Sequence, residues 1–84
     1  MTTVSPLKIA LLTELDRAPH QMPLVPHDAL RNSVRWAVAP QPTYSEIDDA
    51  IADLDRDGMI TCTRSNLYGD RWAITDAGRV ALRG

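Results

Sequence analysis

Cysteine and aromatic residues are scarce in this chain of 84 residues, which has one Cys, two Trp, two Tyr and no Phe. The single thiol, Cys62, has no partner for an internal disulfide, so nothing in the sequence points to an oxidising compartment. Cys62 lies between two threonines, and we expect it to be a small apolar side chain of a strand rather than a nucleophile. So few aromatic rings give little material for a deep apolar cleft.

Long hydrophobic runs are missing as well. No apolar stretch approaches the roughly 20 residues that a membrane-spanning helix needs. The first residues, "MTTVSPLK", have neither the basic start nor the apolar run of a signal peptide. We therefore expect a cytoplasmic protein without a membrane segment. The length and the ordinary composition predict a single domain, residues 1–84, with a core small enough for a partner to add to it.

The residue combinations typical of enzymes are also absent from the sequence. Of the two histidines, His20 and His27, neither has a second metal ligand or a nucleophile at a characteristic spacing. Ser33 and Ser45 show no sign of a nearby base, and there is no glycine-rich phosphate loop. The sequence therefore predicts a binding protein with no enzymatic activity and no cofactor.

Helical spacing dominates the first half of the chain. Ser5-Pro6 is a typical helix start, and leucines at every fourth position predict an amphipathic helix that ends near Ala18. Three prolines within residues 19–26 predict a loop with at most a short extended piece. A second helix is expected over His27–Val38, before the segment "APQP".

The clearest helix start in the sequence is at Thr43. Together with Glu46 it forms a capping box, in which each side chain accepts a hydrogen bond from the backbone of the other residue. The helix that follows has one apolar face, made of Ile47, Ala50, Ile51 and Leu54. Gly58 suits the left-handed position that ends such a helix.

After Gly58 the apolar spacing changes from helical to alternating. The segments "ITCT" and "RWAI", residues 60–63 and 71–74, alternate like half-buried strands. The segment "SNLYGD" between them has the composition of a turn, so the sequence predicts a β-hairpin. A short last helix is expected after Thr75, with Val80 and Leu82 as its apolar residues.

The segment "DLDRDGMI", residues 53–60, has a second interpretation. Asp53, Asp55 and Asp57 alternate before Gly58, as the ligands of an EF-hand calcium loop do. That loop needs a bidentate acid at its twelfth position, where this chain has Arg64. A helix should also follow the loop, but the sequence alternates as in a strand. We therefore interpret the segment as a helix end.

Residues 43–82 resemble the winged helix–turn–helix domain of bacterial regulators such as the MarR and PadR types. Those domains end their third helix with a leucine, a glycine and an apolar pair, then form a two-stranded wing and leave it through an "LT..G" step. The matching residues here are Leu54, Gly58, Met59, Ile60, Gly69-Asp70-Arg71 and Ile74-Thr75-Asp76-Ala77-Gly78. The resemblance covers about half the chain. It implies an α+β winged-helix fold, with a three-helix core, a C-terminal two-stranded wing and a short last helix.

In that family the third helix enters the major groove of DNA and the wing contacts phosphates. Carried over by position, the groove-facing residues would be Thr43, Ser45, Glu46, Asp48, Asp49 and Asp53. Residues 43–57 contain six acidic residues and one basic residue, a net charge of −5 in a chain of net charge −2. Because phosphates supply most of the non-specific affinity for DNA, this face argues against DNA binding.

Two functions therefore remain open. The favoured one is a protein-interaction or self-associating module, with candidate contacts at Glu46, Asp48, Asp49, Asp53, Trp36 and Tyr68. The alternative is a DNA-binding transcriptional regulator that contacts duplex DNA through Arg64, Arg71, Arg31, Arg35, Thr43 and Ser45. The choice depends on whether the carboxylates of residues 43–57 are free of ion pairs with Arg31, Arg35 or Arg71.

Overall fold

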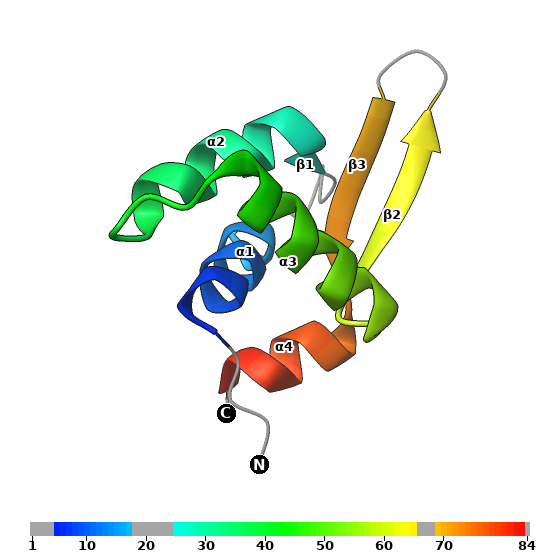
Figure 1. The fold of residues 1–84 in the computed structure, drawn as a ribbon. Helices are drawn as coiled ribbons and strands as arrows, with labels where there is room; N and C mark the ends of the chain where they lie inside the picture. Colours follow the sequence, from blue (N-terminus) through cyan, green and yellow to red (C-terminus); the bar gives the residue numbers. More distant parts are fainter. Residues whose placement is uncertain (1–4, 18–24, 66–68, 84) are drawn as a thin grey trace.

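The structure is a computed structural model that describes residues 5–17, 25–65 and 69–83. These residues form an α+β fold of four helices and a three-stranded antiparallel sheet of strand order β1-β3-β2. In chain order the elements are α1 Pro6–Asp16, β1 Val25–Pro26, α2 His27–Ala37, α3 Tyr44–Arg56, β2 Ile60–Ser65, β3 Gly69–Ile74 and α4 Asp76–Arg83. Figure 1 shows α2 and α3 packed around α1, with the β2–β3 hairpin extending beyond the helices.

The helix starts agree with the local signals in the sequence. The Ser5 hydroxyl accepts a hydrogen bond from the backbone N–H of Lys8, 3.2 Å away, at the start of α1. At α3 both halves of the capping box are present: Thr43 Oγ1 accepts from Glu46 N, and Glu46 Oε1 accepts from Thr43 N, each at 3.1 Å. The helix α2 ends at Ala37, one residue before the predicted end, and Ala18 lies outside the described residues.

We expect Thr43→Ala to lower the free energy of unfolding by about 1 kcal/mol, because the first turn of α3 loses a side-chain acceptor for its backbone N–H groups. Ser45→Ala is the matched control, since Ser45 is exposed and takes no part in the capping box; its effect should stay within about 0.5 kcal/mol. Urea denaturation measures both, and equal losses in the two variants would contradict this role of Thr43.

The end of α3 confirms the helix interpretation of residues 53–60. Gly58 has φ +77°, and its N–H donates to the carbonyl of Asp55 at 3.1 Å, while the N–H of Met59 donates to the carbonyl of Leu54 at 2.9 Å. This pair of bonds is the Schellman motif that satisfies the last carbonyls of a helix. Asp53 therefore belongs to the last turns of α3 and not to a calcium loop.

The hairpin forms as predicted and acquires a third strand. In β2 and β3, Cys62 is opposite Trp72. On the other side of β3, Val25 of β1 pairs with Trp72 and Pro26 pairs with Arg71. The sequence predicted two strands, because a two-residue strand is too short to give an alternating pattern. A proline is tolerated in β1, since β1 is an edge strand.

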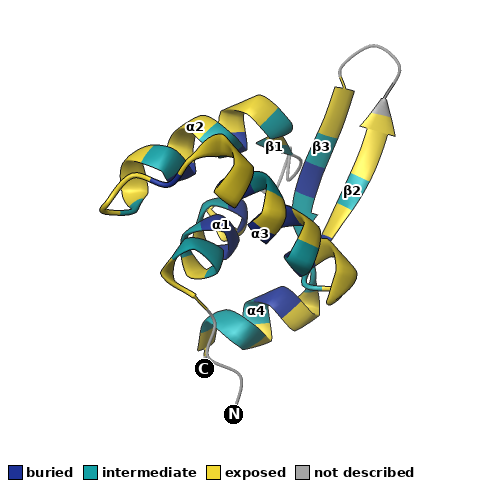
Figure 2. Ribbon diagram, viewed as in Figure 1, coloured by how far each residue is buried: buried dark blue, intermediate teal, exposed yellow. Residues whose placement is uncertain are grey.

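The core lies between the helices and the inner face of the hairpin (Figure 2). Its buried residues are Leu11, Leu12, Leu15, Leu30, Val34, Ile47, Ala50, Ile51, Leu54, Ile60 and Trp72. The half-buried Cys62 packs against this core, as expected for a small apolar side chain. Of the two apolar residues expected for the last helix, Leu82 packs on the core, whereas Val80 is exposed.

Hydrogen bonds of Thr75 connect the corner after α3, which is Gly58 and Met59, to the start of α4. The backbone N–H of Thr75 donates to the carbonyl of Met59 at 3.0 Å, and its hydroxyl donates to the carbonyl of Gly58 at 2.7 Å. The same hydroxyl accepts from the N–H of Gly78 at 3.2 Å. Four residues that carry the resemblance to winged-helix domains thus meet at one junction, although up to 20 positions separate them.

Candidate interaction surface

The carboxylates of α3 were predicted to form a free acidic face, and the structure corrects this for Asp48. The Oδ1 atom of Asp48 lies 3.2 Å from Nε2 of His27 and 3.2 Å from Nε of Arg31. The contact with Arg31 lacks the geometry of a hydrogen bond and is an ion pair. An ion pair with Arg31, Arg35 or Arg71 was the contact expected to argue against a free acidic surface, and this is one of them. It forms because α2 packs beside α3.

Two further candidate carboxylates are engaged within the chain. Asp53 lies 3.5 Å from Nζ of Lys8 in α1 and also pairs with Arg56 one turn along α3. Glu46 is used by the capping box. With Lys8 and Arg31 counted beside residues 43–57, the region contains six acidic and three basic side chains, a net charge of −3.

The outer face of α3 therefore carries both ion-paired and unpaired charged side chains. Helical spacing places Ser45, Asp49, Ala52 and Arg56 in one outward row, and all four are exposed. Asp49, Asp55 and Asp57 are exposed and have no ion pair with any residue that the structure describes. They are the unpaired carboxylates of residues 43–57, and only Asp49 among them was a predicted contact residue.

The arginines of α2 are held by a tyrosine that the sequence analysis did not single out. The guanidinium carbon of Arg31 lies 4.2 Å from the ring centroid of Tyr44, and that of Arg35 lies 4.9 Å from it. Nη1 of Arg35 also donates to the Tyr44 hydroxyl at 3.1 Å. Such cation–π contacts fix a guanidinium in place. The four-residue spacing of Arg31 and Arg35 is the signal that puts both on one side of α2.

The two arginines of the β2–β3 hairpin differ in exposure. Arg64 is exposed on β2 and stands opposite Asp70 of β3. Arg71 is half-buried on β3 and makes contacts of its own. Arg31 and Arg35 are also half-buried. Of the four arginines named for DNA contact, Arg64 alone is therefore exposed.

A hydrogen-bonded chain through His27 connects the sheet to α3. The indole Nε1 of Trp72 donates to Nδ1 of His27 at 3.0 Å. An indole N–H can only donate, so Nδ1 accepts, and the proton of the neutral ring is on Nε2, which donates to Asp48 at 3.2 Å. The sequence analysis missed this contact, because Trp72 and His27 are 45 positions apart.

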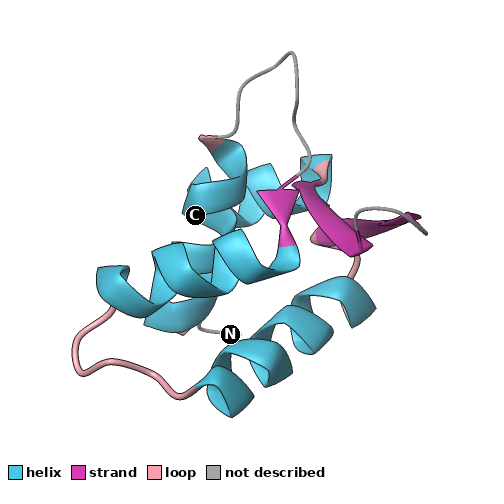
Figure 3. Ribbon diagram, turned by 90° about the horizontal axis from the view of Figure 1, so that it is seen from above, coloured by secondary structure: helices cyan, strands magenta, loops and turns pink. Residues whose placement is uncertain are grey.

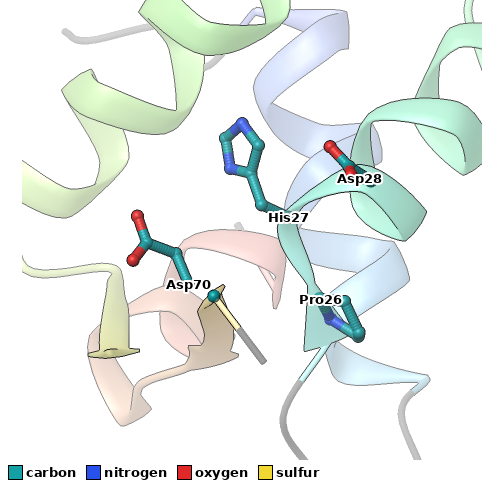
Figure 4. A pocket seen from close by; sticks show the side chains of 5 residues that line it. Pro26, His27, Asp28 and Asp70 are labelled. Atoms are coloured by element: carbon teal, nitrogen blue, oxygen red, sulfur yellow. The ribbon is translucent and has the colours of Figure 1, made fainter. Parts of the chain in front are cut away.

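His27 also lines a surface hollow of about 410 Å³, together with Pro26, Asp28, Gly69 and Asp70 (Figure 4). Figure 4 shows His27 and Asp28 at the start of α2, with Asp70 on the neighbouring strand. Both nitrogens of the imidazole are already bonded inside the protein, so neither is free as a base or a metal ligand. Within the described ranges, no group of three His, Cys, Asp or Glu side chains is placed to hold a metal ion.

Trp36 is the most exposed of the large hydrophobic residues that the structure describes, with 78% of its surface accessible. It lies on the outer side of α2, away from the buried Leu30 and Val34. Tyr68, the other aromatic candidate contact, and His20 lie outside the described residues.

An apolar groove lies close to Trp36, between the start of α1 and the loop that joins α2 to α3. Its volume is about 440 Å³. The lining residues are Ser5, Pro6, Leu7, Val38, Ala39, Pro40, Gln41, Pro42 and Glu46. Figure 3 shows this loop at the end of the helices away from the strands.

Comparisons with known proteins do not assign the chain to a family. Neither a scan against protein-family models nor a search of curated proteins found a match. Among the described helices, none combines the length and the apolar character needed to cross a membrane.

Proposed function

We propose that this chain is a winged-helix binding module without enzymatic activity, which recognises a protein surface rather than DNA. Two kinds of observation support the proposal. The first is the arrangement of the elements, in which three helices precede a hairpin and a short last helix. The second is that the arginines of α2 are engaged within the chain, whereas several carboxylates of residues 43–57 are exposed.

The assignment to the winged-helix class is supported by the junction at Thr75. In the resembling family, the glycine after the third helix and the "LT..G" step are separate motifs in the sequence. Here Gly58 and Met59 accept hydrogen bonds from Thr75, and Thr75 accepts one from Gly78. These hydrogen bonds join the two motifs, because they hold the end of the hairpin and the start of α4 against the end of α3.

The observation that carries the choice of a protein partner is the engagement of the arginines. Arg31 and Arg35 are stacked on Tyr44, and Arg31 also neutralises Asp48. Freeing them for phosphates would break these contacts, whereas Asp49, Asp55 and Asp57 stay exposed on the helix that would enter the groove. Association with DNA needs a surplus of accessible cations, and this surface has a surplus of accessible carboxylates.

Fluorescence anisotropy of a labelled random-sequence duplex tests this choice. At low salt we expect no binding by the natural protein, because α3 repels the phosphates. The variant Asp49→Lys with Asp55→Lys should gain salt-dependent affinity, since a winged helix presents α3 to the groove. Its control, Asp16→Lys with Asp76→Lys, makes the same change of charge on α1 and α4, where it also removes the ion pairs of both residues with Arg79, and should bind more weakly.

The opposite result would replace the proposal. If the natural protein binds the duplex with a steep dependence on salt, and Arg64→Ala with Arg71→Ala reduces that slope, the wing neutralises phosphates. The chain would then be a DNA-binding regulator. Equal affinity of the two lysine variants would instead show that α3 has no special position relative to DNA.

A further inference from the structure

We propose that this chain binds a second copy of itself through the outer side of α2, and that each copy inserts Trp36 into the other copy's proline groove. The proline groove is the hollow lined by Ser5–Leu7, Val38–Pro42 and Glu46. The proposal rests on the proposed function, because it names one partner for a protein-binding module. It adds a surface that the acidic end of α3 does not provide.

The groove has the shape and chemistry to take an aromatic ring. Three of its lining residues are prolines, Pro6, Pro40 and Pro42, whose rings restrict the backbone and offer flat apolar surfaces. Pro42 is itself buried, which fixes this wall of the groove. A preformed apolar hollow of this kind loses little conformational freedom when a rigid aromatic side chain enters it.

The single acidic residue of the groove matches the single polar group of an indole. Glu46 lines the groove, and its Oε1 accepts from the backbone N–H of Thr43. Its second oxygen makes no hydrogen bond with the residues that the structure describes. A buried tryptophan needs an acceptor for its Nε1–H. The free carboxylate oxygen of Glu46 supplies one at the edge of an otherwise apolar hollow.

Trp36 is the indole of this chain that is available for such a site. It is 78% exposed, whereas Trp72 is 8% exposed and already donates to His27. Trp36 precedes Val38 by two positions, so its Cα lies within about 7 Å of the groove wall. Its high exposure shows that it does not occupy the groove of its own chain.

This closeness of the Trp36 backbone to the groove fits a two-fold dimer. In such a dimer the same patch faces itself, and each of two neighbouring features contacts the other one on the partner. The outer row of α2 around Trp36 is exposed and uncharged, and consists of Ala29, Asn32, Ser33 and Trp36. In a chain with 24% charged residues, a row without charge beside an exposed tryptophan is typical of an interface centre.

Analytical ultracentrifugation over a range of protein concentrations tests the proposal. The natural protein should dimerise, and Trp36→Ala should weaken the dimer at least about 100-fold, because each dimer loses two buried aromatic anchors. The matched control is Val80→Ala, which removes another exposed apolar side chain, from α4, and should dimerise like the natural protein. Ala39→Arg, which fills the groove from an exposed position, should weaken the dimer as strongly as Trp36→Ala.

A mixture of the two variants tests the exchange of rings directly. The Trp36→Ala chain has an open groove but no Trp36 to insert. The Ala39→Arg chain has Trp36 but a filled groove. In a mixed dimer, Trp36 of the Ala39→Arg chain enters the open groove of the Trp36→Ala chain, so the mixture should contain more dimer than either variant alone. Tryptophan emission should shift to the blue as the dimer forms, because Trp36 leaves water.

Three results would overturn the proposal: a natural protein that stays monomeric at millimolar concentration, a Trp36→Ala variant that dimerises like the natural protein, or a mixture no more dimeric than its components. These results leave the proposed function standing if the duplex still does not bind. Salt-dependent duplex binding would overturn the proposed function, whatever the oligomeric state.

Discussion

Replacing Gly78 with alanine is expected to lower the free energy of unfolding by about 2–3 kcal/mol. Gly78 is buried in α4. A Cβ atom added there would collide with the carbonyl oxygen of Met59, and would lie 2.7 Å from Cγ1 of Ile74 and 3.2 Å from Cδ2 of Leu12. Alanine favours a helix over glycine by about 1 kcal/mol, so the sign of the change shows which effect is larger.

The collision is costly because the carbonyl of Met59 is held in place. It accepts the backbone N–H of Thr75 at 3.0 Å, while the Thr75 hydroxyl donates to Gly58 at 2.7 Å. Moving α4 away from the corner would lengthen both bonds. A glycine is therefore required at position 78 by the close approach of two backbones and not by its own backbone angles.

Urea denaturation of Gly78→Ala beside Gly58→Ala separates two reasons for a glycine. At Gly58 the added Cβ meets open space, but φ is +77°, so alanine should cost about 1–2 kcal/mol in backbone strain alone. Gly58→Asn should cost less, since asparagine tolerates that region better. A neutral or stabilising Gly78→Ala would contradict the close approach of α4 to Met59.

Features that depend on a few neighbouring residues were predictable from the sequence. The capping box of α3, the end of that helix at Gly58 and the alternation of the hairpin each involve side chains and backbone groups within six positions. The calcium and helix interpretations of residues 53–60 were also separable, because the test position, Arg64, lies only four positions beyond that segment.

The distribution of charge was not predictable in the same way. Counting along the chain gave residues 43–57 a net charge of −5, but Lys8 and Arg31 reach this helix from α1 and α2. The partners of Asp53 and Asp48 thus lie 45 and 17 positions away. Contacts across such separations follow from the packing of the helices, which spacing in one segment does not give.

The position of Trp36 shows what amphipathic spacing contributes to a functional site. Trp36 was predicted as a contact residue, it lies off the Leu30–Val34 stripe of α2, and the structure leaves it exposed. The groove beside it could not be foreseen, since its walls come from the start of α1, the loop after α2 and Glu46 of α3. The sequence identified one half of the proposed interface, and the fold supplies the other half.

Removing the side chain of Trp72 is expected to have the largest effect of any single substitution considered. Trp72 is 8% exposed and pairs with both neighbouring strands. Trp72→Ala should cost about 3–5 kcal/mol, a large part of the roughly 4–12 kcal/mol that stabilises a domain of this length. Thermal and urea denaturation measure the loss as a lower melting temperature and a lower urea midpoint. A loss below about 1 kcal/mol would contradict the position of this ring in the core.

Trp72→Phe isolates the hydrogen bond from the packing. Phenylalanine keeps an aromatic ring in the core but cannot donate to Nδ1 of His27, so we expect a loss of about 1–2 kcal/mol. In a double-mutant cycle with His27→Ala the two losses should be non-additive by about 1 kcal/mol, because both variants remove the same 3.0 Å bond. Thr43→Ala is the control partner, since it shares no hydrogen bond with Trp72, and its effect should add. Full additivity in both cycles would show that the contact between Trp72 and His27 does not stabilise the fold.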